Sequence, residues 1–254
     1  MVPFAPTSHS RRGRAASATR FTWPKLDIQS LLLFVPVLLF SVIAHEYAHG
    51  YAALKQGDTT AYMLGRLTWN PIKHIDPFMT VLLPLLLWYG SGGRMLLGGA
   101  KPVPVNPRNY RNFKRGDIIV SLAGVFTNLL VAIACVLLVP VFGVVAHIIP
   151  SLERSCAILQ TMMTIGVYLN MMLIAFNLIP IPPLDGSHVI KYLLPPSWSF
   201  KYMQLSRFGI VVLILLLYMA PGVLNMWLYP AQYTGRTMLG VVNQFMLPLV
   251  QRLQ

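Results

Sequence analysis

The sequence predicts an all-α polytopic membrane protein with about four full spans and one re-entrant segment. Hydrophobic residues make up 56% of the 254-residue chain. Charged residues make up only 11%, against the roughly 25% that is usual in soluble domains. The apolar residues also gather into runs that are long enough to cross a bilayer. This composition excludes an ordinary soluble domain.

Four apolar runs are expected to form the full spans, at about residues 30–54, 117–142, 158–179 and 206–229. A fifth apolar stretch, residues 77–90, is shorter and contains Pro84. A helix of this length would cover roughly 21 Å, against about 30 Å of hydrocarbon. We therefore expect residues 77–90 to enter the membrane and return on the same side.

The remaining segments also have expected structures. Residues 58–70 are polar, with alternating Thr, Tyr and Trp side chains, which favours a short β-hairpin. Residues 1–29 form a basic tail that is expected to be disordered, with an organelle transit peptide as the alternative. Residues 30–229 are expected to form a membrane-embedded domain. An interfacial helix is expected over residues 230–254.

The first span contains ionisable side chains in the sequence HEYAHG, residues 45–50. Ionisable groups in a membrane helix are costly, so they generally serve a function. His45 and His49 are one helical turn apart and can reach one metal ion from the same face. Glu46 can act as a base toward water held by that metal. The alternative is a structural role, in which these groups satisfy a broken helix by hydrogen bonding.

A third ligand is needed, because a catalytic zinc ion takes three protein ligands and keeps one position open. The chain has seven acidic residues, and most of them lie in the tail, in connections or at span ends. Asp185 differs, because it follows an apolar run and three prolines that prevent a regular helix. The alternative is that Asp185 caps a short helix expected from Gly186 to Leu194.

Together these motifs resemble the site-2 protease family of intramembrane zinc metalloproteases, in the compact form without PDZ or CBS domains. The resemblance covers most of residues 40–190 and includes HEYAHG, GRLTWNPIKHIDP, AKPVPVNPRNYRN, SLAGVFTNLL and FNLIPIPPLDGSH. It implies that His45, His49 and Asp185 bind a single Zn²⁺ ion. It also implies that Glu46 is the catalytic base.

The resemblance also gives weaker candidates. Asn128 and Asn177 lie in apolar spans and are expected to hold the substrate backbone or support the site, with interhelical hydrogen bonding as the alternative. His74 and His188 are expected to be structural or to support the site, because three ligands already suffice. The family often has proline at the position of Val125, and this departure does not touch the metal site.

Charge and topology predict the side of the membrane on which the site lies. The two histidines and Asp185 must share one depth, which requires an even number of crossings between them. Residues 91–117 carry six basic residues against one acid, a net charge of +5, whereas residues 143–157 sum to zero. The positive-inside rule then places the zinc site toward the cytoplasm. The N-terminal tail, with a net charge of +4, disagrees with this topology.

The implied function is hydrolysis of peptide bonds in or near transmembrane segments of other membrane proteins. The expected partners are a transmembrane substrate and the lipid bilayer. No nucleic acid is expected despite the net charge of +13, because orientation and anionic lipid account for basic connections. We expect a multi-pass protein of the bacterial cytoplasmic membrane, with an organelle membrane as the alternative.

Two other functions stay open at this point. One is a non-proteolytic or inactive membrane zinc-binding homologue. The other is a membrane zinc protease of a different class, with a later glutamate as ligand, although the chain has no glutamate after Glu153. The sequence does not predict the oligomeric state or the identity of the substrate.

Overall fold

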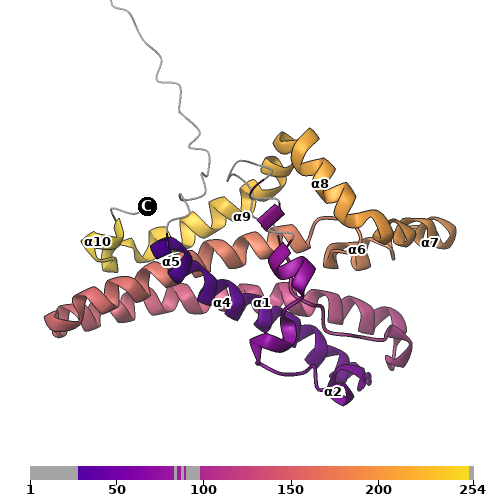
Figure 1. Cartoon of the computed structure of the whole chain (residues 1–254), viewed down its shortest axis with the longest axis horizontal. Helices are drawn as coiled ribbons and strands as arrows, with labels where there is room; N and C mark the ends of the chain where they lie inside the picture. Colours follow the sequence, from indigo (N-terminus) through magenta and orange to yellow (C-terminus); the bar gives the residue numbers. More distant parts are fainter. Residues whose placement is uncertain (1–27, 83–84, 87–88, 90–97, 252–254) are drawn as a thin grey trace, which may run out of the picture.

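The computed structural model describes residues 28–82, 85–86, 89 and 98–251, which form helices joined by short connections (Figure 1). No strand occurs in this part of the chain, so the all-α class is confirmed. Four helical stretches are long and apolar enough to cross a membrane: Gln29–Gln56, Phe113–Ile148, Pro150–Asn177 and Pro196–Met219. The first three correspond to the spans expected from the sequence. The basic tail lies almost entirely outside the described residues.

Helix α4 (Phe113–Ile148) packs along both α1 (Ile28–Gln56) and α5 (Glu153–Asn177), and α9 (Pro221–Val242) also packs on α5 (Figure 1). Many of the buried residues at these contacts are small, including Ala132, Cys135, Ala175 and Ala231. Small residues let helix backbones approach closely, which favours association in a membrane. A Cβ atom at Gly166 would lie only 2.6 Å from Cys135 Sγ, so a larger residue does not fit there.

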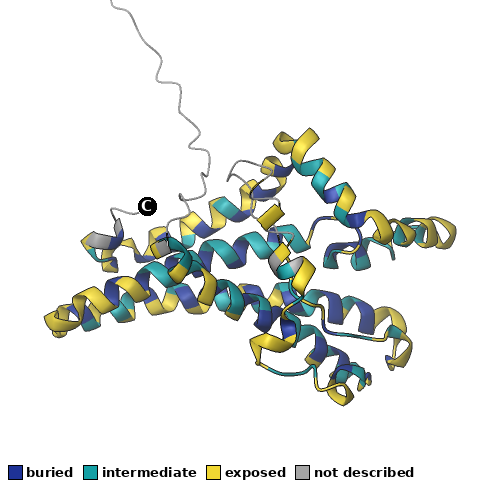
Figure 2. Ribbon diagram, viewed as in Figure 1, coloured by how far each residue is buried: buried dark blue, intermediate teal, exposed yellow. Residues whose placement is uncertain are grey.

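Large apolar side chains lie on the outer faces of the helices, which Figure 2 shows as exposed. Leu137 on α4 and Met219 on α8 (Gly209–Met219) are 63% and 80% exposed. Apolar exposure on this scale is unusual for a soluble monomer. It suits helices whose backbone bonds are satisfied internally and whose side chains face hydrocarbon. The fold is that of an integral, multi-pass membrane protein.

The boundaries predicted for the last span, 206–229, are wrong. Helix α8 ends at Met219 and α9 begins at Pro221, with Ala220 between them at φ −134° and ψ 51°. Proline lacks the N–H that would continue the helix and disfavours helical geometry at the residue before it. The apolar span therefore lies earlier, and it contains α7 (Pro196–Gln204), η5 (Leu205–Phe208) and α8.

The β-hairpin predicted for residues 58–70 is also wrong. The segment contains a one-turn helix, α2 (Thr60–Met63), and it leads into the 3₁₀ helix η1 (Pro71–His74). Gly65 follows α2 with a positive φ of 60°, which turns the chain. The alternation of side chains in this segment therefore does not correspond to an extended strand.

Asp58 explains why the segment turns. Its fully buried carboxylate accepts hydrogen bonds from the backbone and hydroxyl of Thr60, from the Asn106 N–H at 2.6 Å and from Asn109 Nδ2 at 2.8 Å. Burial alone would raise the pKa of this carboxyl, but the hydrogen bonds outweigh burial and hold the pKa below its usual value. Asp58 thus ties the loop after α1 to the 3₁₀ helix η3 (Pro107–Asn109).

The predicted re-entrant segment, residues 77–90, lies partly outside the described residues. Its first part forms a short π-helix, η2 (Pro77–Leu82). The side chain of Thr80 donates a hydrogen bond to the carbonyl of Gly99 at 2.7 Å. The start of this segment is therefore held close to the chain that follows the undescribed part.

The C-terminal part of the chain is anchored on α5. Helix α9 runs through the boundary at residues 229/230, and Leu228 and Ala231 are buried in the same core. Beyond α9 lie η6 (Asn243–Phe245) and α10 (Pro248–Gln251). The buried Gln160 of α5 donates to the carbonyl of Phe245 at 2.9 Å and accepts from the Leu247 N–H at 2.9 Å.

Candidate metal centre

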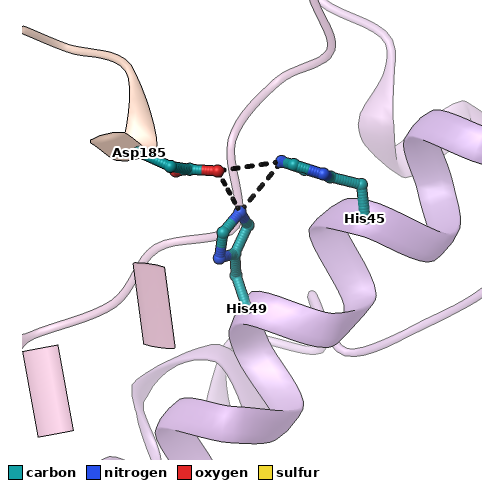
Figure 3. A group of neighbouring side chains, drawn as sticks. All are labelled: His45, His49 and Asp185. Atoms are coloured by element: carbon teal, nitrogen blue, oxygen red, sulfur yellow. Dashed lines mark hydrogen bonds and ion pairs between the residues drawn. The ribbon is translucent and has the colours of Figure 1, made fainter. Parts of the chain in front are cut away.

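His45 and His49 lie one turn apart on α1, and both imidazoles point toward the start of α6 (Asp185–Ile190), as Figure 3 shows. Their Nε2 atoms are 3.0 Å apart, and each of these atoms lies 3.3 Å from Asp185 Oδ2. The side chains of His45, His49 and Asp185 are only 9%, 12% and 18% exposed. Three potential ligand atoms therefore form a small, enclosed, nearly equilateral triangle.

The triangle has the size of one face of a tetrahedral zinc site. With Zn–N distances of about 2.0–2.1 Å, ligand atoms of a tetrahedron lie about 3.3–3.4 Å apart. Asp185 Oδ2 is buried and has no hydrogen-bond partner among the described residues, so a cation held between it and the two imidazoles would satisfy it. If both rings carry their proton on Nδ1, both Nε2 lone pairs, 3.0 Å apart, face the same point, which suits a shared cation. The three residues fit a single Zn²⁺ ion.

Helix α4 orients His49 from the side opposite the triangle. His49 Nδ1 lies 2.7 Å from the carbonyl oxygen of Val120. A carbonyl only accepts hydrogen bonds, so Nδ1 must carry the proton, and Nε2 keeps its lone pair for a metal. The hydrogen bond therefore fixes both the tautomer and the direction of the His49 ring.

Asn128 occupies the corresponding position behind His45. This asparagine is fully buried, and its Nδ2 lies 3.2 Å from His45 Nδ1. Its Oδ1 is buried and has no hydrogen-bond partner in the described part of the chain. If His45 Nε2 binds a metal, His45 Nδ1 carries a proton and needs an acceptor. Rotating the Asn128 amide by 180° exchanges its oxygen and nitrogen. Oδ1 then accepts a hydrogen bond from His45 Nδ1, so both atoms gain a partner.

Gly124 makes room for the His45 ring between these two contacts. A Cβ atom at this position would lie 2.5 Å from His45 Cε1 and 2.6 Å from both ring nitrogens. Any larger residue would therefore displace the imidazole.

Glu46 is held by the backbone of a proline-rich segment. One of its carboxylate oxygens, Oε2, accepts a hydrogen bond from the Val103 N–H at 2.8 Å. Val103 lies between Pro102 and Pro104, and proline has no backbone N–H. The Val103 amide is thus the single backbone donor of this tripeptide, and it is used to hold Glu46.

Asp185 is the first residue of α6, and its carboxylate faces the two histidines. The N-cap position is Leu184, which makes no side-chain capping bond, so the capping role considered for Asp185 is not observed. A Cβ atom at Gly186 would lie 2.5 Å from the carbonyl oxygen of Leu178. The start of α6 is therefore packed tightly against the end of α5.

Asn177 does not join this group. Its Nδ2 donates to the Leu173 carbonyl at 2.9 Å, one turn earlier in α5. His74 also lies apart, with Nε2 at 2.9 Å from the carbonyl of Thr68. His188, in contrast, contacts the buried Asp117 of α4.

Sequence reasoning missed two buried polar residues near the centre. The sequence places Asp117 at the start of a span, but its side chain is only 3% exposed and binds His188 and Lys191, which follow Asp185. Asn170 of α5 donates to Ser41 Oγ at 2.9 Å, four residues before His45 in α1. An amide or a carboxylate in an otherwise apolar span was the signal available for both.

The fold and the site define a class, namely a multi-pass membrane protein in which the two histidines of an HExxH motif meet a distant aspartate in a candidate metal centre. The family model for peptidase family M50 matches residues 33–219. The chain therefore belongs to peptidase family M50, the site-2 protease family. No PDZ or CBS domain is evident in the 254 residues.

Named relatives agree with this assignment. The chain is 35% identical over 218 residues to "Putative zinc metalloprotease YwhC" of Bacillus subtilis (strain 168), covering 85% of this chain and 92% of that protein. It is 29% identical over 202 residues to "Putative zinc metalloprotease Rip2" of Mycolicibacterium smegmatis, covering 80% and 72%. The Mycobacterium tuberculosis H37Rv protein of the same name is 31% identical over 204 residues, covering 79% and 73%. No solved structure matches the chain.

Proposed function

We propose that the protein is an intramembrane zinc metalloendopeptidase that hydrolyses peptide bonds in or near transmembrane segments of other membrane proteins. The observation that carries this proposal is the enclosed triangle of His45, His49 and Asp185, with edges of 3.0 to 3.3 Å. These three residues would hold one zinc ion. When bound, zinc supplies Lewis-acid activation of water and of the scissile carbonyl group.

Glu46 is the group that would move the proton. Glu46 directly follows His45 in α1, so it lies beside the two histidines. As general base it would take a proton from the attacking water and then give that proton to the leaving amine nitrogen. A carboxylate has two oxygens, so Glu46 can keep its bond to the Val103 N–H through Oε2 while Oε1 takes the proton.

The substrate class follows from the position of the site among apolar helices. A peptide bond inside a transmembrane helix is shielded by the hydrogen bonds of that helix, so the substrate must unwind locally before it is cut. We place the protein in the bacterial cytoplasmic membrane with the site toward the cytoplasm, on the basis of the basic residues before α4. Residues 30–229 would be the membrane-embedded catalytic domain.

The test is cleavage of a panel of tagged single-span proteins by the full chain in liposomes, with the zinc content of every sample measured. We expect Glu46→Gln to lose at least about 100-fold in rate while keeping its zinc. We expect Asp185→Ala to lose both activity and zinc. Glu153→Gln is the matched control, because Glu153 is the exposed first residue of α5, and it should cleave like the wild type.

Three outcomes would contradict parts of this proposal. Undiminished cleavage by Glu46→Gln would overturn the role of Glu46 as base. Full zinc content in Asp185→Ala would remove Asp185 from the ligand set. A wild-type protein that binds zinc and cleaves no member of the panel would favour the non-proteolytic alternative.

A further inference from the structure

Asp185 lies on α6, whereas His45 and His49 lie on α1. The position of α6 relative to α1 must therefore be fixed for the three side chains to bind one ion. Helix α6 has only six residues, which is too short for a helix to be stable alone. It follows a connection that contains Pro180, Pro182 and Pro183. Zinc ligands must nevertheless lie within about 0.2 Å of their ideal distances. Some contact outside the triangle has to supply this accuracy.

The carboxylate of Asp117 makes such a contact. Asp117 lies in the first turns of α4, and its side chain is only 3% exposed. Its Oδ2 lies 2.6 Å from Lys191 Nζ and accepts a hydrogen bond from the Tyr192 hydroxyl at 3.0 Å. Its Oδ1 lies 3.3 Å from His188 Nδ1. One buried carboxylate thus binds three side chains at the end of α6 and just beyond it.

Asp117 belongs to the same helix face that orients the histidines. Val120, Gly124 and Asn128 of α4 contact or make room for His49 and His45. At about 100° per residue, these three positions lie within roughly 60° of Asp117 around the helix axis. A single face of α4 therefore holds the rings of both histidines and, through Asp117, the helix that begins with Asp185.

We propose that Asp117 is a positioning residue for the metal centre, which sets the place of Asp185 relative to His45 and His49 by fixing α6 on α4. This inference rests on the proposed function, in which Asp185 is a zinc ligand. Asp117 does not touch the metal, and it acts through Lys191, Tyr192 and His188. Its loss leaves all three ligands in the chain but lets α6 shift away from α1.

The experiment measures the zinc affinity of the purified full chain in detergent, by competition with a chelator of known affinity. For Asp117→Asn we expect zinc binding about 10- to 100-fold weaker than in the wild type, the usual effect of removing a residue that supports a ligand. Co²⁺ in place of zinc gives a second readout, because its visible spectrum reports coordination geometry. The Co²⁺ spectrum of Asp117→Asn should change even at saturating metal.

The matched control is Asp58→Asn. Asp58 is also a fully buried, multiply hydrogen-bonded aspartate, but its partners lie in the loops around α2 and η3. This variant should lose stability, yet its zinc affinity and Co²⁺ spectrum should stay at the wild-type values. The comparison separates general destabilisation from a shift of α6.

A second variant guards against misfolding of Asp117→Asn. Asp117→Leu combined with Lys191→Met removes both members of the buried ion pair, so no unpaired charge is left inside the protein. It should also bind zinc at least tenfold more weakly. Wild-type affinity and an unchanged Co²⁺ spectrum in either folded variant would overturn the proposal. Because these readouts need no substrate, they are independent of whether the wild type cleaves any protein.

Discussion

The ring of His45 lies directly over Gly124, at a position where even one methyl group would collide with it. The same ring has Asn128 behind Nδ1 and the metal triangle in front of Nε2. At the scale of single residues, the HExxH motif therefore supplies only part of the centre. The other part is the shape and hydrogen bonding of α4, which the motif does not reveal.

Gly124→Ala tests the space under the ring. The added Cβ would lie 2.5 Å from His45 Cε1, so the imidazole must move. We expect zinc affinity to fall at least about tenfold, with a matching loss of cleavage. Gly240→Ala in α9 is the control, because no atom of the described residues outside the adjoining helix backbone lies within 4 Å of the added Cβ. Competition with a chelator measures the zinc affinity of both variants. Wild-type zinc affinity in Gly124→Ala would mean that the His45 ring can move aside without loss of the metal.

Substitutions of Asn128 test whether His45 carries its proton on Nδ1. Asn128→Leu removes the acceptor for the Nδ1 proton from a fully buried position, and we expect about tenfold weaker zinc binding. Asn128→Asp keeps an acceptor oxygen, so its zinc affinity should remain within a few-fold of the wild type. Equal affinities in Asn128→Leu and the wild type would mean that His45 needs no partner at Nδ1.

At the scale of elements, the contact between the loop that follows α1 and the 3₁₀ helix η3 depends on Asp58. Its pKa is held below the usual value, so the stability it contributes is fully present above about pH 4. That stability is lost as the pH falls through the lowered pKa of the folded state. The loop should therefore open in acid while the apolar helices remain.

Asp58→Asn should lower the free energy of unfolding by about 1–3 kcal/mol at pH 7, because one of the two buried acceptor oxygens is replaced by an amide donor. The dependence of thermal stability on pH below about 4 should also become shallower than in the wild type. Thermal denaturation in detergent from pH 3 to pH 7 measures both effects. A parallel pH dependence in the two proteins would mean that Asp58 carries no such linkage.

The elements that could be predicted were those determined by local pattern. Hydropathy identified three spans closely, and the spacing of His45 and His49 placed both rings on one face. The hairpin prediction failed because Asp58 is bound by Asn106 and Asn109, about fifty residues later. The bonds of Asp117 to His188 and Tyr192 span 71 and 75 residues. Contacts of that range have no signature in a single sequence.

At the scale of the whole molecule, α4 has 36 residues and a length of about 54 Å, well over the roughly 30 Å of hydrocarbon. Its two ends should therefore lie on opposite sides of the membrane. The charge difference between the segments at these ends predicts that the basic segment before α4 faces the cytoplasm.

Cysteine labelling in intact bacteria tests this orientation. The two native cysteines are buried and can be replaced by alanine, after which single cysteines are introduced as Ser151→Cys or Arg108→Cys. A membrane-impermeant maleimide should label Ser151→Cys directly and Arg108→Cys only after lysis. The reverse pattern would place the metal centre on the outer side. Labelling of both positions in intact cells would mean that α4 does not cross.

Four positions of α4 contact or support the metal-binding residues, and their spacing limits which insertions and deletions this helix can tolerate. Asp117, Val120, Gly124 and Asn128 act together only because the helix repeats every 3.6 residues. One residue inserted between Asp117 and Asn128 would rotate one half of this face by about 100° relative to the other. An inserted leucine would leave the hydropathy of the span unchanged and every ligand present in the chain. We expect such length changes within this part of α4 to be far less tolerated than apolar substitutions on its other faces.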